Sequence, residues 1–361
     1  MSTLASLLLR SARLVVPAAA ALSMIGGTAA MAAPAKTPKS APFTWHTFKL
    51  LNGWASASSS NLRTGTPAWA THDGVVYFRG AIKNPAPSPS EELAQLPASD
   101  SPARVLYIEV YTSAGLAGAL IVNPGGEVDA LDGNAGPFTS LAGVSYPLPS
   151  IKPHSLKPEH GWRSDQGKYG TGDPGYAISH GVVYLSGSLH HGNKPVALVL
   201  PKAARPPHEM YRSIYTFDGN PGSVVIRPNG QVELFGAHAA RFTSLAAISY
   251  PVTGTNWHNF FLTGGWKSGS TRFHSSAPAY TTLNGVVYLT GTMYQTSGTN
   301  VHWANFPAAV RPAALSYLEV NAANATTGAI TIFAIGRVDS TPFADAQGGT
   351  SLGGISYPAG S

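Results

Sequence analysis

Cysteine is absent from this 361-residue sequence, which excludes disulfide bridges, thiolate metal sites and a lipid on an N-terminal cysteine. Charge is also scarce, since only 11% of the residues are Asp, Glu, Lys or Arg, and Lys and Arg form no cluster. Nucleic acid is therefore not an expected partner, because binding to phosphates needs concentrated positive charge. Long apolar runs are missing after the first 32 residues, so we expect no membrane span.

The first residues have the three parts of a secretory signal peptide. Two arginines precede an apolar stretch from Leu14 to Ile25, and small residues follow as far as Ala32. The stretch is shorter than the roughly 20 residues that span a bilayer. We therefore predict a signal peptide over residues 1–32, a disordered lead-in over residues 33–42, and a secreted, extracellular protein.

Helical periodicity is missing from the rest of the chain, where no sustained apolar pattern at i, i+3, i+4 and i+7 occurs. Glycine and proline are abundant, with 39 and 29 residues, and they divide the chain into short segments rich in β-branched and aromatic residues. Such a composition is typical of short strands joined by tight turns. The sequence predicts an all-β fold.

One module of about 105 residues occurs three times in tandem. We assign the copies to residues 43–147, 148–251 and 252–358, and expect each to form a jelly-roll-like β-sandwich. Short connections favour modules that pack on one another, either around a pseudo-threefold axis within a monomer or in a linear row. The recurring landmarks are a Gly-Trp pair (Trp54, Trp162, Trp266), Gly-Val-Val-Tyr (ending at Tyr77, Tyr184, Tyr288), a later tyrosine (Tyr107, Tyr211, Tyr317), Thr-Ser-Leu (ending at Leu141, Leu245, Leu352) and Ser-Tyr-Pro (ending at Pro147, Pro251, Pro358).

A hairpin is predicted in the second copy, where the strand-like run Ser223 to Ile226 is followed by Asn229-Gly230 and by a second run from Gln231 to Phe235. Asn-Gly between two such runs is a strong hairpin signal.

The landmark order Trp, GVVYLxG, LPxxxRP, hairpin and SLxGISYP resembles the C-terminal receptor-binding module of phage tail fibres. The match is most complete in copies two and three, whereas copy one has Ser101 in place of the arginine. The resemblance implies a module that works as a homotrimer and recognises a cell-surface glycan or protein. Three fused copies would reproduce that trimer within one chain. The export signal departs from the family, whose fibres are assembled inside the host cell.

Catalytic motifs are missing: there is no GxSxG, HExxH or P-loop. We recognise no acidic position shared by all three copies; Glu109, for example, aligns with Ser213 and Glu319. The sequence therefore favours a non-catalytic protein without a cofactor. Two alternatives stay open, namely a structural, envelope-associated protein that self-assembles and a hydrolase with its site in a single copy.

Histidine recurs at one position of each copy, as His46, His154 and His258. If the modules surround an axis, these imidazoles would converge on a metal or an anion. The alternative, which we favour, is that each histidine fills the same hydrogen-bonded position within its own module. No metal ligand is assigned.

Aromatic residues offer two interpretations, a buried core or a surface for stacking against sugars. We assign Trp54, Trp162 and Trp266 to the cores, because large rings are the usual contents of a small sandwich. Binding is expected in the loops that follow the GVVY strands, where the copies differ. The candidate ligand-binding residues there are His190, His191, Tyr294, His302 and Trp303.

Overall fold

The structure is a computed structural model that describes residues 42–86, 90–131, 134–252, 255–323, 326–341 and 343–360. All of these lie in one compact unit, Ser40–Ser361. The predicted signal peptide, residues 1–32, and the lead-in up to residue 41 lie outside the described residues. Every strand pair is antiparallel, and the predicted all-β class is confirmed. Within the described residues, no helix is long and apolar enough to cross a membrane.

Each of the three sequence copies, called repeats 1 to 3 from here on, contains the same succession of strands. Repeat 1 comprises β1 (His46–Thr47), β2 (Ala55–Ser56), β3 (Ala68–His72), β4 (Val75–Arg79), β5 (Ala81–Lys83), β6 (Glu92–Gln95), β7 (Leu106–Tyr111), β8 (Ala117–Val122), β9 (Glu127–Leu131), β10 (Thr139–Ser140) and β11 (Ser145–Pro147). Repeat 2 comprises β12 (His154–Ser155), β13 (Arg163–Ser164), α1 (Gln166–Tyr169), β14 (Gly175–Ser179), β15 (Val182–Ser186), β16 (Ser188–His190), β17 (Val196–Val199), β18 (Met210–Tyr215), β19 (Pro221–Ile226), β20 (Gln231–Phe235), β21 (Thr243–Ser244) and β22 (Ser249–Pro251). Repeat 3 comprises β23 (His258–Asn259), β24 (Trp266–Ser268), β25 (Ala279–Leu283), β26 (Val286–Thr290), β27 (Thr292–Gln295), β28 (His302–Asn305), β29 (Ser316–Ala322), β30 (Thr327–Ile332), β31 (Arg337–Thr341), α2 (Phe343–Gly348), β32 (Thr350–Ser351) and β33 (Ile355–Pro358).

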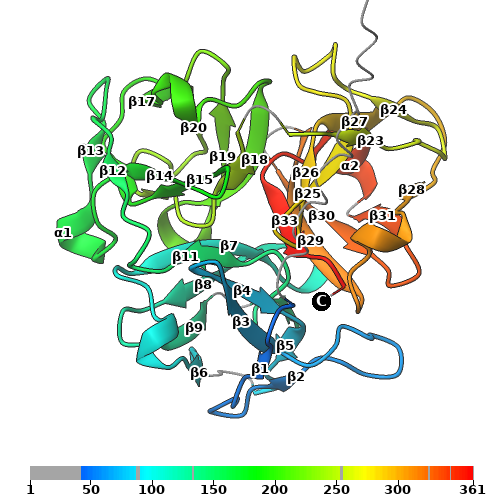
Figure 1. Ribbon diagram of the computed structural model, residues 1–361, viewed down its shortest axis with the longest axis horizontal. Helices are drawn as coiled ribbons and strands as arrows, with labels where there is room; N and C mark the ends of the chain where they lie inside the picture. Colours follow the sequence, from blue (N-terminus) through cyan, green and yellow to red (C-terminus); the bar gives the residue numbers. More distant parts are fainter. Residues whose placement is uncertain are drawn as a thin grey trace, which may run out of the picture. The chain divides into compact units, whose positions relative to one another are not determined.

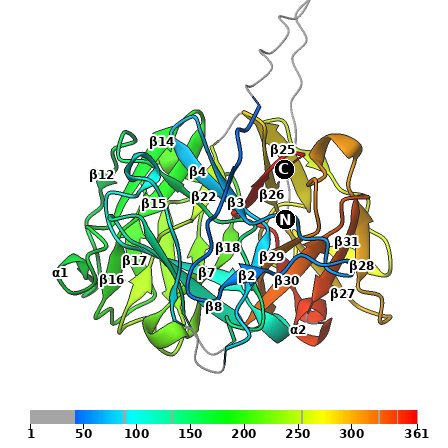
Figure 2. The same ribbon diagram turned by 90° about the horizontal axis from the view of Figure 1, so that it is seen from below.

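The strand order is the same in the three repeats. One four-stranded sheet contains the GVVY strand and runs β1-β3-β4-β11, β12-β14-β15-β22 or β23-β25-β26-β33. The opposite sheet runs β6-β9-β8-β7 in repeat 1 and β17-β20-β19-β18 in repeat 2. In repeat 3 that sheet continues through β32 and β27 to β24, which makes seven strands. Figure 2 shows β4, β15 and β26 toward the upper end, and β7, β18 and β29 below them.

The predicted hairpin in repeat 2 is confirmed as β19 and β20. Gly230 closes its turn with a φ of 95°, and a Cβ at this position would lie 2.5 Å from the carbonyl oxygen of Leu200. Only glycine avoids both the positive φ penalty and that clash. Gly126 and Gly336 have the same conformation in the other repeats, with φ of 93° and 98°.

The tyrosine of each Ser-Tyr-Pro landmark has one structural role. Its hydroxyl donates to a backbone carbonyl in a short 3₁₀ turn. In repeat 2 this turn is Lys202–Ala204, and Tyr250 donates to the carbonyl of Ala204 at 2.7 Å. Tyr146 and Tyr357 donate in the same way to Asp100 and Val310, at 2.7 and 2.6 Å. A buried phenol requires a hydrogen-bond partner, and this requirement explains why tyrosine recurs at this position.

Each repeat has its own apolar core between its sheets. Trp54, Trp162 and Trp266 are buried in these cores, as predicted, with exposures of 4–5%. Their indole N–H groups donate to the backbone carbonyls of Ser90, Lys194 and Asn300 at 2.7–2.8 Å, so each ring is satisfied inside its own repeat.

The three repeats meet around a common centre, as Figure 1 shows with repeat 1 in blue to cyan, repeat 2 in green and repeat 3 in yellow to red. One apolar cluster there takes the same two residues from each repeat, a valine and the tyrosine of the GVVY strand: Val75, Tyr77, Val182, Tyr184, Val286 and Tyr288. The three tyrosine side chains lie close enough for their hydroxyl groups to interact with one another. Strands β7, β18 and β29 also contact each other pairwise.

Candidate functional site

Two of the three boundaries between repeats are filled by aromatic rings. Between repeats 1 and 2, Tyr107 stacks on Tyr215 with the ring centres 5.5 Å apart and meets Phe242 edge-on at 5.2 Å. Between repeats 3 and 1, Tyr317 stacks on Tyr111 at 5.4 Å and meets Phe138 at 5.3 Å. Each tyrosine on one repeat therefore packs between two rings of the next.

The boundary between repeats 2 and 3 lacks those two rings. Tyr211 of β18 is equivalent to Tyr107 and Tyr317, but the positions that should face it hold Asn321 and Gly349. In the space left open lies a pocket of about 330 Å³ lined by Tyr211, Asn321 and Gly349. This volume is at the lower end of the roughly 300–1,000 Å³ that small-molecule sites occupy.

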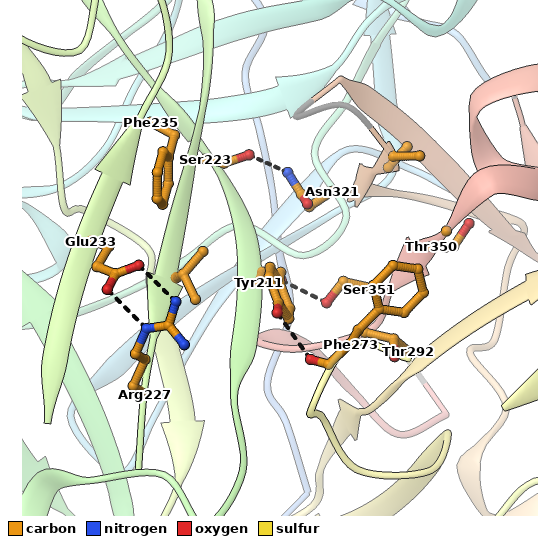
Figure 3. Close-up of a pocket in the computed structure, with 14 residues that line it drawn as sticks. Tyr211, Ser223, Arg227, Glu233, Phe235, Phe273, Thr292, Asn321, Thr350 and Ser351 are labelled. Atoms are coloured by element: carbon orange, nitrogen blue, oxygen red, sulfur yellow. Dashed lines mark hydrogen bonds and ion pairs between the residues drawn. The ribbon is translucent and has the colours of Figure 1, made fainter. Parts of the chain in front are cut away.

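Aromatic side chains from both repeats wall the pocket. Phe235 at the end of β20 and Phe273, which follows β24, stand on either side of Tyr211 in Figure 3. Phe235 is 37% exposed, although it is a large apolar residue. A side chain on Gly349 would collide with Phe273, because a Cβ there would lie 2.9 Å from the ring. Glycine therefore allows Phe273 to reach its place in the wall.

Tyr211 is held in position from both sides of the boundary. Its hydroxyl donates to the backbone carbonyl of Phe273 at 2.9 Å and also contacts Glu209 at 2.8 Å. The hydroxyl of Ser351 donates to the backbone carbonyl of Tyr211 at 2.7 Å. Burial, followed by the hydrogen bond and negative charge of Glu209, raises the pKa of Tyr211, so its phenol stays neutral.

Charged residues gather on the repeat 2 side of the pocket. The guanidinium of Arg227 donates to both oxygens of Glu233, at 2.8 and 3.0 Å, and to Glu209. Two carboxylates against one guanidinium leave one net negative charge. Because these carboxylates accept all three of the Arg227 interactions, the guanidinium is occupied and the pocket favours neutral or cationic ligands over anions.

Neutral polar side chains complete the lining. The side-chain amide of Asn321 donates to the hydroxyl of Ser223 across the boundary between the repeats. Thr292 and Thr350 add two further hydroxyls. Figure 3 shows Asn321 and Ser223 joined on one side and Thr350 on the other. The site thus combines apolar ring faces with a few hydrogen-bonding groups, the usual make-up of a small-molecule site.

The prediction that Trp303 binds a ligand from an exposed loop is wrong. Trp303 lies in strand β28 and is fully buried in the core of repeat 3. Leu93 and Ala197 occupy the same buried position in the other repeats, so the indole fills core space rather than presenting a face to solvent. Its neighbour His302 is half-buried and its Nδ1 lies 3.1 Å from the carbonyl oxygen of Val338.

The other predicted residues are spread over separate places. Tyr294 lies in β27, beside the guanidinium of Arg272, whose carbon is 4.9 Å from the ring centre. His190 and His191 contact each other at the end of β16 in repeat 2. None of these residues lines the pocket described above, so the structure does not bring the predicted set together.

The axial arrangement considered for His46, His154 and His258 is contradicted. Each histidine is exposed on the edge strand of its sheet, with its ring 5.3–5.4 Å from Trp69, Tyr176 or Tyr280. Valine and tyrosine fill the centre instead. Within the described ranges, no group of three His, Cys, Asp or Glu side chains could hold a metal ion.

Sequence reasoning missed two features of the repeats. One acidic position does recur, as Asp129, Glu233 and Asp339, directly after the valine of the second hairpin strand. Burial and the charge of Glu127 raise the pKa of Asp129 to about 6.

The loss of two aromatic rings in repeat 3 was also visible in the sequence, since aligning the repeats places Asn321 with two tyrosines and Gly349 with two phenylalanines. The sequence does not show that this loss opens a pocket, because it does not show that these two positions face Tyr211.

No known protein family, curated protein or solved structure matches this chain.

Proposed function

We propose that this protein is a secreted, non-catalytic binding protein that recognises a sugar residue of a surface glycan in the pocket between repeats 2 and 3. The observation that carries the proposal is the replacement of two aromatic rings by Asn321 and Gly349 at one of three equivalent boundaries. Filling this space with rings would add stabilising contacts, as at the other boundaries. A pocket kept open at this one boundary is best explained by a ligand that occupies it.

The chemistry of the lining supports a sugar. A sugar ring has an apolar face, which would lie on Phe235 or Phe273, and hydroxyl groups, which would bond to Asn321 or Ser223. The net negative charge of the Arg227 cluster favours a neutral or amino sugar over an acidic one. The resemblance to tail-fibre modules and the export signal support a ligand on a cell surface outside the producing cell.

The carboxylates beside the pocket support binding rather than hydrolysis. Glu209 and Glu233 both accept hydrogen bonds from Arg227, so both carboxylates are already engaged within the protein. A glycosidase needs two carboxyl groups that flank the scissile bond and are free to act on it. The pair is therefore better suited to shaping the pocket than to cleaving a glycosidic bond.

The test is a glycan array followed by calorimetric titration of each hit, with the wild type and Asn321→Tyr. The new tyrosine would stack on Tyr211 as Tyr111 stacks on Tyr317, so it should fill this pocket and abolish binding in it while the fold is kept. His190→Ala is the matched control, because it alters a predicted binding loop away from the pocket. Binding that survives Asn321→Tyr but is lost in His190→Ala would contradict the proposal, as would an absence of hits or release of reducing sugar during the titration.

A further inference from the structure

A second cavity at the boundary between repeats 2 and 3 has a different lining. Its volume is about 460 Å³, and it is built around the half-buried ring of Trp257, which directly precedes β23. Asn259 of the same strand and His208 from repeat 2 also line it. Trp257 packs against the apolar cluster at the centre of the three repeats, and this contact fixes the position of its ring.

The polar side chains around Trp257 carry hydroxyl, amide or imidazole groups. Hydroxyl groups come from Ser270, Ser276 and Thr290, and the side chains of Ser276 and Thr290 lie 3.1 Å apart. Among the described residues that line the cavity, none is Asp, Glu, Lys or Arg. A set of hydroxyl, amide and imidazole groups around an indole suits a neutral, polyhydroxylated ligand, because it offers many hydrogen bonds and no compensating charge for an ion.

Comparison of the repeats shows that this indole lacks the arginine that lies over its counterpart. Trp45 is the equivalent residue of repeat 1, and the guanidinium of Arg79 lies over it, 4.2 Å from the ring centre. The position of Arg79 is taken by Thr290 in repeat 3, and both Thr290 and Trp257 face the same cavity. The replacement of an arginine by a short hydroxylated residue thus removes the cation from above the ring and leaves a hydroxyl group at the cavity.

We propose that the Trp257 cavity is a second binding site, which takes a neutral sugar unit with its apolar face on the indole. The site shares no lining residue with the pocket around Tyr211. It stands on its own observations and does not depend on a ligand in that pocket.

The experiment titrates the full mature chain with neutral hexasaccharides of glucose, mannose and xylose, and follows tryptophan fluorescence and heat. Oligogalacturonate and chitosan oligomers serve as anionic and cationic probes. At least one neutral oligosaccharide should change the fluorescence. Thr290→Arg should weaken that binding about tenfold or more, because the new guanidinium would cover Trp257 as Arg79 covers Trp45. Trp257→Ala should have the same effect.

Two controls separate this site from the first pocket. Asn321→Tyr should leave the fluorescence response unchanged, since it alters only the pocket around Tyr211. Trp45→Ala should also leave it unchanged, because that indole is covered. The inference is overturned if no neutral oligosaccharide binds, if Thr290→Arg binds as tightly as the wild type, or if a charged oligomer binds better than every neutral one. Loss of the response in Asn321→Tyr alone would assign the sugar to the first pocket.

Discussion

Glu109 of repeat 1 and Glu319 of repeat 3 occupy equivalent positions and interact with each other in the buried centre of the protein, with exposures of 8% and 5%. Arg212 from repeat 2 interacts with both, and its guanidinium donates to the backbone carbonyl of Glu319 at 2.8 Å. Ser213 stands where repeat 2 would have supplied a third carboxylate. Three buried carboxylates would repel one another. Ser213 avoids the third carboxylate, and Arg212 supplies a positive charge beside the remaining two.

The pH dependence of stability should follow from this pair. Burial raises the pKa of Glu109 well above its usual value, the charge of Glu319 raises it further, and Arg212 acts in the opposite direction. Below a pH of about 4.3 the carboxyl is protonated in both the folded and the unfolded chain. Above that pH the unfolded chain releases the proton first, so the folded state loses stability until the pH passes its raised pKa.

Glu109→Gln should remove that loss. We expect the variant and the wild type to melt at similar temperatures near pH 4, and the variant to melt higher at pH 7 to 8, by roughly 2–4 °C for each kcal/mol gained. Melting curves by circular dichroism at pH 4, 6 and 8 measure the difference. The exposed Glu91→Gln is the control, and a difference that does not change with pH would contradict the assignment.

Trp303→Ala should destabilise repeat 3 strongly. The indole is fully buried in the core, and truncating such a ring costs about 3–5 kcal/mol. Replacement by leucine, the residue of repeat 1, should cost much less because most of the volume is kept. Urea titrations followed by near-ultraviolet circular dichroism test this. If Trp303→Ala unfolds at the wild-type urea concentration, the residue is not part of the core.

The boundary between repeats 1 and 2 should open when its rings are exchanged for the residues of repeat 3. Tyr215→Asn combined with Phe242→Gly would leave Tyr107 without its two partners, as Tyr211 is in the wild type. We expect a lower melting temperature, because buried rings are lost. Asn321→Tyr should shift it in the opposite direction. Differential scanning calorimetry measures the melting temperatures of both variants. Equal shifts of the melting temperature in the same direction would contradict the equivalence of the boundaries.

The tyrosine of each Ser-Tyr-Pro landmark should contribute one hydrogen bond to stability. Tyr250→Phe leaves the carbonyl of Ala204 without its side-chain donor and should cost about 1 kcal/mol. Tyr146→Phe and Tyr357→Phe should behave alike. Tyr294→Phe is the control, because its hydroxyl has no hydrogen bond in the described part of the chain. Chemical unfolding of the four variants provides the comparison, and three unequal losses would show that the shared contact is not equivalent.

Sequence alone was sufficient for the β class, the hairpin at Asn229-Gly230 and the burial of Trp54, Trp162 and Trp266. These features follow from local propensity and from residues repeated at a fixed spacing, both of which can be read along the chain. The same reasoning predicts Trp303 on the surface, because it treats a residue that differs between repeats as a ligand contact. A core position tolerates different apolar side chains as long as its volume is filled.

Tertiary structure alone decided where the repeats meet and what lies between them. Asn321, Gly349 and Tyr211 are far apart in the sequence, and nothing local indicates that they face one another. The same holds for Glu109 and Glu319, and for Trp257 and Thr290. Their significance comes from contacts across repeat boundaries, and such contacts depend on how whole sheets pack rather than on the conformational preferences of neighbouring residues.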